Sequence, residues 1–218
     1  MKDMNVYTVN VKCPGCGKES QFTMHTLIDA ARDPRALNKL FSGEYFTHVC
    51  PICKTVRPVT YSCMYHDGSN KVLIGFADSE KDYAEMKEAL SGERKNDKLD
   101  EVLSQWLSTS EVRIVRSEYA LQEKALISYL GLDDRIIEIA RYQEMKKLKE
   151  TRNDVLDLLF NTEGEDRYFL VVTEEGIQDK ILFTNESYQS IQQRYKDILE
   201  NNEEQIIDLD WASKIVEE

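Results

Sequence analysis

Apolar and polar side chains alternate in two short stretches near the start of the chain, residues 7–11 and 21–24, and a period of two is typical of half-buried β-strands. The few residues between them predict a tight connection and an antiparallel pair. Asp33 followed by Pro34 is a common helix start, because aspartate caps free N–H groups and proline suits the first helical position. We therefore expect an antiparallel strand pair followed by a helix over residues 34–42.

Farther along the chain, the hydrophobic pattern changes repeatedly between the strand period and the helix period. Apolar residues at every second position predict strands, and apolar residues at i, i+3, i+4 and i+7 predict helices. The expected strands and extended segments cover residues 45–49, 56–65, 71–76, 112–115, 168–173, 177–184 and 206–209, and the expected helices cover 97–106, 117–130, 133–152, 188–199 and a short segment from Trp211.

Four cysteines occur as two C-P-x-C turns, Cys13–Cys16 and Cys50–Cys53. Each turn directs two sulfur atoms toward one point, and two facing turns supply four thiolates at about 2.3 Å from a structural, tetrahedral zinc ion. Gly17 suits the left-handed conformation that follows such a turn, whereas Lys54 must tolerate strain there or use another geometry. We predict one Zn²⁺ bound by Cys13, Cys16, Cys50 and Cys53. Rubredoxin-like iron, a redox pair and two unrelated turns are the alternatives.

Thirty-three residues separate the two cysteine pairs, compared with about 15–20 in an ordinary zinc ribbon. The helix expected over residues 34–42 accounts for the excess. The sequence thus predicts an α+β fold, in which a zinc-ribbon-like antiparallel β region with an inserted helix precedes a mainly helical α+β region with a hairpin. We place these regions at residues 1–77 and 78–218, and leave open that they share one core.

The formal net charge of −12 is unevenly distributed along the 218 residues. Residues 1–66 hold eight Lys or Arg and five Asp or Glu, whereas residues 67–218 hold twenty and thirty-five. The acidic part is typical of a solvated helical surface, and no basic stripe of a nucleic-acid-binding protein is evident. The sequence contains no run of about 18 apolar residues, the length needed to span a membrane. An odd count of five cysteines and the lack of a signal peptide predict a cytoplasmic protein with reduced thiols.

The two cysteine turns, together with Tyr65-His66-Asp67, resemble the CpXC domain family of prokaryotic proteins. Residues 113–116, 132–138, 207–208 and 211–212 resemble segments that often follow this domain, so the resemblance covers most of the chain. Lys54 departs from the glycine that many members carry. The resemblance implies that the four cysteines hold a metal ion, and it implies no particular biochemical activity.

Four other side chains are candidates for chemistry. His66 with Asp67 is interpreted either as an exposed hairpin end, part of an interaction surface with Tyr65, or as an acid/base pair that lacks an evident nucleophile. His48 is expected to be a partly exposed strand residue that faces away from the metal. Cys63 is expected to be a buried, inert thiol. We assign no catalytic residue.

Three functions remain open. The first is a non-enzymatic protein-interaction or regulatory module with an unknown protein partner. The second is a nucleic-acid-binding zinc-ribbon protein, and the third is an enzyme with a site near His66 and Asp67. A four-thiolate zinc site leaves no open coordination position for catalysis, which favours the first. The basic residues that would serve the second are Lys12, Lys18, Lys39, Lys54 and Arg57.

Overall fold

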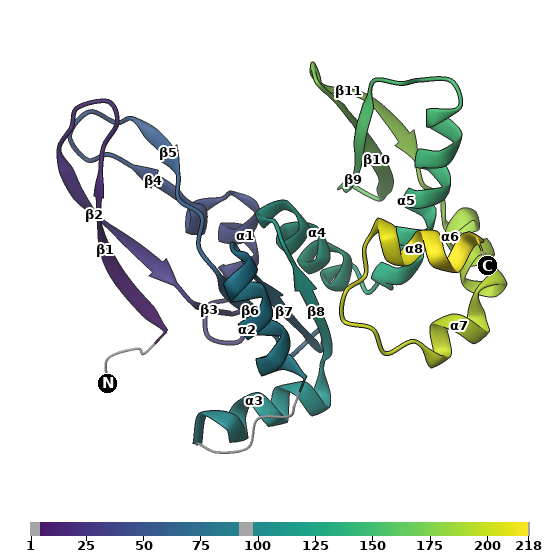
Figure 1. Ribbon diagram of the computed structural model, residues 1–218, viewed down its shortest axis with the longest axis horizontal. Helices are drawn as coiled ribbons and strands as arrows, with labels where there is room; N and C mark the ends of the chain where they lie inside the picture. The colour runs from purple at the N-terminus through teal and green to yellow at the C-terminus, as the bar shows by residue number, and fades with distance from the viewer. Residues whose placement is uncertain (1–4, 92–97, 218) are drawn as a thin grey trace. The chain divides into compact units, whose positions relative to one another are not determined.

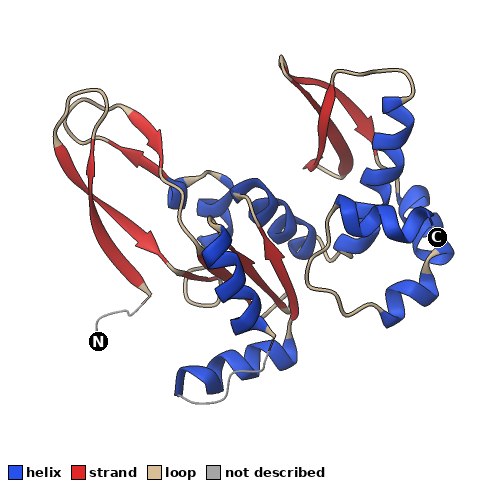
Figure 2. Cartoon of the chain, in the orientation of Figure 1, coloured by secondary structure: helices blue, strands red, loops and turns tan. Residues whose placement is uncertain are grey.

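The computed structural model describes residues 5–91 and 98–217, with the side chains of 98–100 outside the description. It contains both helices and strands and confirms the α+β class (Figure 2). The chain divides into two compact units, a first unit (Met1–Ala125) and a second unit (Leu126–Glu218). Within the described ranges, no helix combines the length and the apolar character needed to cross a membrane.

A four-stranded sheet forms the centre of the first unit (Figure 1). Its strands, in order across the sheet, are β3 (Leu27–Asp29), β6 (Cys63–Asp67), β7 (Val72–Phe76) and β8 (Glu111–Val115). β6 and β7 pair antiparallel, while β3 and β8 pair parallel to them at the two edges. Every residue of β7 is buried, which is typical of a central strand covered on both faces.

Helices cover both faces of this sheet. The helices of the first unit are α1 (Ala36–Phe41), α2 (Glu80–Leu90), α3 (Lys98–Thr109) and α4 (Glu118–Tyr129), with a short 3₁₀ helix η1 (Glu44–Phe46). On one face, Tyr65 shares a buried core with Leu40 of α1 and Leu121 of α4. On the other face, α2 approaches β7 so closely that a β-carbon at Gly75 would meet Met86 Cγ at 2.7 Å.

Two short β-ribbons extend from the sheet within the first unit (Figure 1). One ribbon pairs β1 (Val6–Lys12) with β2 (Glu19–His25), and the other pairs β4 (Thr47–Val49) with β5 (Val56–Pro58), both antiparallel. The strand expected over residues 56–65 is therefore two strands, because β5 pairs within its ribbon and β6 within the central sheet. The helix expected over 34–42 is present as α1, between the two ribbons in sequence.

The two compact units meet in sequence between Ala125 and Leu126, whereas we expected a division after residue 77. The reason is the pairing of β8, which lies beside β7 from Val72↔Glu111 to Phe76↔Val115. This pairing places β8 in the central sheet, and α2 packs against β7 and β8. The expected helix over 97–106 corresponds to α3, although its start at Asp97 lies outside the described residues.

The second unit combines a three-stranded antiparallel sheet with helices. Its elements are α5 (Asp134–Lys149), β9 (Val155–Glu163), β10 (Asp166–Thr173), β11 (Gly176–Leu182), α6 (Asn185–Arg194), α7 (Lys196–Asn201) and α8 (Leu209–Glu217). The strand order is β11-β10-β9, and the predicted hairpin is confirmed as β10 and β11. One core joins the sheet and helices, with Phe169, Ile137 and Trp211 all buried in it.

Two expectations for the second unit were wrong. The helix expected over 188–199 is interrupted at Tyr195, whose backbone leaves the helical region (φ −107°, ψ 19°) and separates α6 from α7. Residues 206–209 form no strand, and Leu209 instead begins α8. Both expectations rested on apolar residues that recur at regular spacing. Tyr195, Leu199 and Ile207 are indeed buried in the same core, but the spacing of buried residues does not show whether the backbone between them is a continuous helix or strand.

Candidate metal centre

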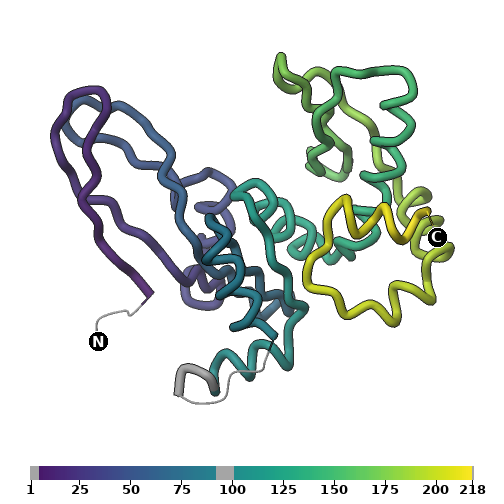
Figure 3. The backbone as a smooth tube through the Cα atoms, viewed as in Figure 1, coloured from purple at the N-terminus to yellow at the C-terminus, as the bar shows by residue number. Residues whose placement is uncertain are grey.

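The two C-P-x-C turns fold into the same knuckle, and they lie side by side at the ends of the ribbons (Figure 3). In each knuckle the first cysteine accepts a backbone hydrogen bond from the residue four positions later and donates one to the residue five positions later. These bonds are Gly17 N to Cys13 O (2.9 Å), Cys13 N to Lys18 O (2.8 Å), Lys54 N to Cys50 O (3.0 Å) and Cys50 N to Thr55 O (2.9 Å).

Gly17 and Lys54 occupy equivalent positions in the two knuckles. Both have left-handed backbones, with φ of 70° and 63°. Glycine adopts this region freely, whereas lysine carries a β-carbon that makes it unfavourable by about 1–2 kcal/mol. The second knuckle therefore keeps the standard geometry and tolerates the strain, which resolves the two possibilities that the sequence left open.

The four cysteine sulfurs gather at one point. All four Sγ atoms lie within 4.8 Å of one another, with 3.5 Å between those of Cys13 and Cys53 and 3.8 Å between those of Cys16 and Cys50. Four thiolates at zinc–sulfur bond lengths in a tetrahedron would be about 3.8 Å apart. The donor set and its spacing fit one tetrahedral metal ion. Among the described residues, no histidine or carboxylate joins this cluster.

Hydrogen bonds to the sulfurs of Cys50 and Cys53 favour the thiolate form that a metal requires, whereas burial and the neighbouring thiols raise the pKa of Cys16 to about 12. The hydroxyl of Thr55 lies 3.2 Å from Cys53 Sγ, and together with the Thr55 N–H it lowers the pKa of Cys53 to about 6. The backbone N–H groups of Cys53 and Ile52 lower the pKa of Cys50. Thr55 is a residue that the sequence analysis missed, and its position two residues after the last cysteine was the available signal.

The knuckles also contact each other through small residues. A β-carbon at Gly15 would meet Thr55 Oγ1 at 2.4 Å and Cys53 Sγ at 3.5 Å. Gly15 therefore lets the first knuckle rest directly on the second, which brings the two cysteine pairs within reach of one ion.

Side chains behind the knuckles hold the ribbons together. Arg57 Nη1 donates to the carbonyl of Lys12 at 3.1 Å, which links β5 to β1. Deeper along the ribbons, Tyr61 accepts from the His25 N–H at 3.2 Å and donates to the carbonyl of Tyr45 at 2.9 Å. These bonds link the two ribbons through groups outside the sulfur cluster.

His48 was expected to be partly exposed, and this was wrong. Its side chain is buried between the ribbons, where Nε2 lies 2.9 Å from Ser20 Oγ and the ring packs edge-on against Phe22. His48 is not part of the sulfur cluster. Its role is to join β4 to β2 immediately behind the knuckles.

His66 and Asp67 were considered as an exposed hairpin end, and both side chains are in fact buried. The His66 ring stacks on Trp106 of α3, with centroids 4.0 Å apart and planes 18° apart. The carboxylate nearest to His66 belongs to Asp29, 3.5 Å from Nδ1, because β3 pairs directly with β6 at these residues. β3 and β6 lie far apart in the sequence, so this pairing could not be predicted from a local pattern.

Asp67 forms a side-chain turn at the end of β6. Oδ1 accepts from the N–H groups of Ser69 and Asn70 at 3.0 and 3.2 Å, and Oδ2 accepts from Asn70 Nδ2 and the Tyr65 hydroxyl at 2.8 and 3.4 Å. The Asp67 carboxylate therefore accepts hydrogen bonds from groups of the turn and from Tyr65, and not from His66. Tyr65, His66 and Asp67 are each less than 10% exposed, so their side chains form no open interaction surface.

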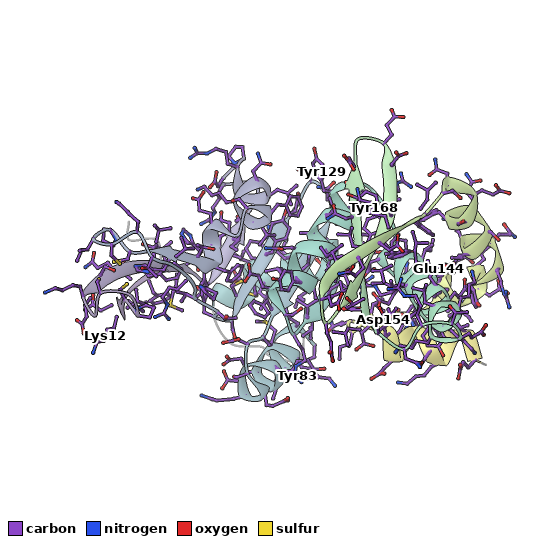
Figure 4. The ribbon with its side chains drawn as sticks, turned by 90° about the horizontal axis from the view of Figure 1, so that it is seen from above. Lys12, Tyr83, Tyr129, Glu144, Asp154 and Tyr168 are labelled. Carbon is purple, nitrogen blue, oxygen red and sulfur yellow. The ribbon has the colours of Figure 1, made fainter. Side chains whose placement is uncertain are left out.

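The remaining candidates are clearly placed. Cys63 is buried in the core of the first unit, and burial raises its pKa to about 12, as expected of an inert thiol. Lys12, Lys18 and Lys54 are exposed on the ribbons, with Lys12 at their outer end in Figure 4. Lys39 lies instead on α1, 2.7 Å from Asp33.

Fold and cysteine cluster together define an α+β protein whose ribbons carry a four-cysteine site that could hold a metal ion. A family model described as CpXC protein matches residues 11–141, more than half of the chain, and the chain therefore belongs to the CpXC family. No curated protein and no solved structure matches it. The matched span covers the end of β1, all of β2, the second ribbon, the central sheet and part of α5.

Proposed function

We propose that this protein is a non-enzymatic protein-interaction or regulatory module of the cytoplasm, whose first unit is held in shape by one structural Zn²⁺. The sulfur cluster carries this proposal. Four thiolates saturate a tetrahedral ion, which leaves no coordination position for a water molecule that could be activated. Zinc is preferred over iron as the more abundant partner of such a structural site.

The exposed end of the second ribbon supports an interaction role. Val49, Ile52 and Val56, here called the ribbon patch, are 52%, 60% and 64% exposed. Val49 and Val56 are cross-strand partners, and Ile52 lies in the knuckle between them. Exposed apolar groups gathered on a rigid support are typical of contact surfaces. The ribbon patch thus replaces Tyr65, His66 and Asp67 as the surface that a protein partner would use.

Nucleic-acid binding is the second candidate, and one observation favours it. Residues 6–25 and 47–58 hold four cations and one carboxylate, although the whole chain has a net charge of −12. The four cations are Lys12, Lys18, Lys54 and Arg57. The zinc–thiolate centre would add −2 to this balance, so the local field is weaker than nucleic-acid proteins usually show. The enzyme alternative loses its support, because His66 and Asp67 are buried and Asp67 is taken up by its turn.

Metal analysis and affinity capture together test the proposal. Freshly purified protein should contain about one zinc ion per chain, with an X-ray absorption spectrum of sulfur ligands only. Tagged protein should capture a partner that is lost when Val49, Ile52 and Val56 are all replaced by serine. The matched control is Tyr119→Ser, since Tyr119 is 70% exposed on α4, away from the ribbons.

Several outcomes would contradict the proposal. A metal ion bound by three sulfurs and one oxygen would favour a catalytic function over a structural one. A captured partner that the ribbon variant retains would place the contact elsewhere. Capture of nucleic acid, sensitive to salt and to Lys12→Ala with Lys54→Ala, would favour the second candidate.

A further inference from the structure

The sheet of the second unit has one face in the core and one face outside it. Phe160 of β9 and Phe169 and Val171 of β10 point into the core. Because side chains alternate along a strand, the residues between them point to the opposite side. That side, called the open face below, carries Leu159, Tyr168, Leu170, Val172 and Ile177.

The apolar residues of the open face are neighbours across the strands. Leu159 pairs with Leu170, and Val172 pairs with Ile177, so the side chains form a continuous stripe over three strands. None of the five residues belongs to the core of the second unit or to the apolar side chains packed against that core. Ile177 is 59% exposed, and the other four are half-buried.

Lys180 confirms the orientation of this face. Its Nζ lies 4.4 Å from the centroid of the Tyr168 ring, which is labelled in Figure 4, and 2.8 Å from Glu163 Oε2. The cation therefore lies on the same side of the sheet as Tyr168 and is already neutralised by a carboxylate.

The surroundings of the open face are strongly acidic. Residues 154–182 hold eight Asp or Glu against two Lys or Arg, a net charge of −6 within 29 residues. Both cations have oxygen partners, since Arg167 donates to Asn185 Oδ1 at 2.9 Å and Lys180 pairs with Glu163. Arg152, just outside this range, pairs with Asp154 and Asp179, and the net charge around the stripe stays negative. A predominantly acidic rim around an apolar stripe attracts cations and repels a second copy of itself.

We propose that the open face binds an extended segment of a partner protein that alternates apolar residues with Lys or Arg. Apolar side chains of the segment pack on Leu170 and its neighbours, and its cations reach carboxylates at the sheet margins, including Asp157. This surface goes beyond the proposed function, because it lies in the second unit and needs no metal.

Peptide binding to the full-length protein tests the proposal. The probe is a fluorescent peptide of alternating lysine and valine, followed by fluorescence anisotropy at low salt. We expect a peptide of alternating lysine and serine, with the same charge, to bind at least about tenfold more weakly. Ile177→Gln and Leu170→Gln should each weaken lysine–valine binding by about tenfold, while Tyr119→Gln changes it by less than about twofold. Ile177 is exposed, so its variant keeps the test valid if Leu170→Gln unfolds the sheet.

Three results would overturn the proposal. Equal binding of the two peptides would show that charge alone attracts them. Unchanged binding in both open-face variants would place the peptide elsewhere. A dimer at about 100 µM by sedimentation equilibrium, lost in Ile177→Gln, would make the face a contact between copies. Zinc content is measured on the same samples. If any of these three results appears while the protein still contains zinc, the open-face proposal fails and the proposed structural zinc site does not.

Discussion

Gly15 of the first knuckle lies against Thr55 of the second, so closely that a β-carbon at residue 15 would come within 2.4 Å of Thr55 Oγ1. Thr55 also supplies the hydroxyl beside Cys53 Sγ. One residue thus sets both the distance between the knuckles and the electrostatics of a metal ligand. The consequence is that the metal centre depends on a position that is not a ligand.

Replacing Gly15 by alanine should push the knuckles apart. We expect the first unit to lose about 1–3 kcal/mol of stability, as in other overpacked sites, and to release its metal faster to a chromophoric chelator. Gly68→Ala is the matched control, because a β-carbon there meets its nearest neighbour, His66 Cε1, at an ordinary 3.5 Å. Equal metal release from Gly15→Ala and the parent protein would show that the knuckles are not in this contact.

Lys54 and Gly17 provide a reciprocal test of backbone strain. Lys54→Gly should raise the free energy of unfolding by up to about 1 kcal/mol, because it removes the β-carbon from a left-handed backbone. Gly17→Ala should lower it by about 1 kcal/mol for the opposite reason, and a β-carbon at Gly17 would meet no atom within 4 Å, so packing is not involved. Denaturant midpoints of zinc-saturated protein measure both. Changes of the same sign would refute the strain argument.

The four-cysteine cluster and the class of fold could be predicted from the sequence because they rest on local patterns. Two short motifs contain Cys13, Cys16, Cys50 and Cys53. The alternation around Val9 and Val11 predicts the strand that leads into the first motif. The left-handed backbone at Lys54 was one of two possibilities that the motifs left open, and the structure decides between them.

Long-range pairings could not be predicted in the same way. Asp29 meets His66 because β3 joins β6 in parallel, and Trp106 reaches His66 from a helix forty residues later in sequence. Neither pairing leaves a local pattern. The same holds for β8, whose pairing with β7 places it in the central sheet of the first unit. Each was decided by tertiary packing, which a reading of periodicity does not contain.

The stack of His66 on Trp106 changes the expected effect of His66→Ala. An exposed turn residue could be truncated at little cost, but a buried ring in contact with an indole should cost about 1–3 kcal/mol. His66→Phe keeps the ring and loses only the contact with Asp29, so it should retain most of the stability. Thermal unfolding of the two variants measures the difference. Unaltered stability of His66→Ala would mean that α3 does not hold Trp106 against the sheet.

Cys63 should make the protein sensitive to alkali and resistant to thiol reagents. Burial raises the pKa of Cys63 to about 12, whereas a thiol in an unfolded chain ionises near about 8.5. A raised pKa in the folded state contributes stability below about pH 8.5, and that contribution is lost as the pH rises toward about 12. Burial raises the pKa of Tyr45 to about 12 as well, and its effect has the same sign but begins near about pH 10.

The free energy of unfolding should therefore fall as pH rises above about 8.5, and Cys63→Ala should reduce the slope between about pH 8.5 and 10, where the buried tyrosines do not yet contribute. At pH 8 a disulfide reagent should find no fast thiol in zinc-loaded protein, four after chelation, and the fifth only in denaturant. Cys13, Cys50 and Cys63 are all buried, at 1%, 0% and 2% exposed. The knuckle cysteines differ from Cys63 because they lie at the ribbon ends and are exposed when the metal that joins the knuckles is removed, whereas Cys63 is enclosed by the core of the first unit. A fifth thiol that reacts as quickly as the other four in folded protein would show that the core around Cys63 opens readily.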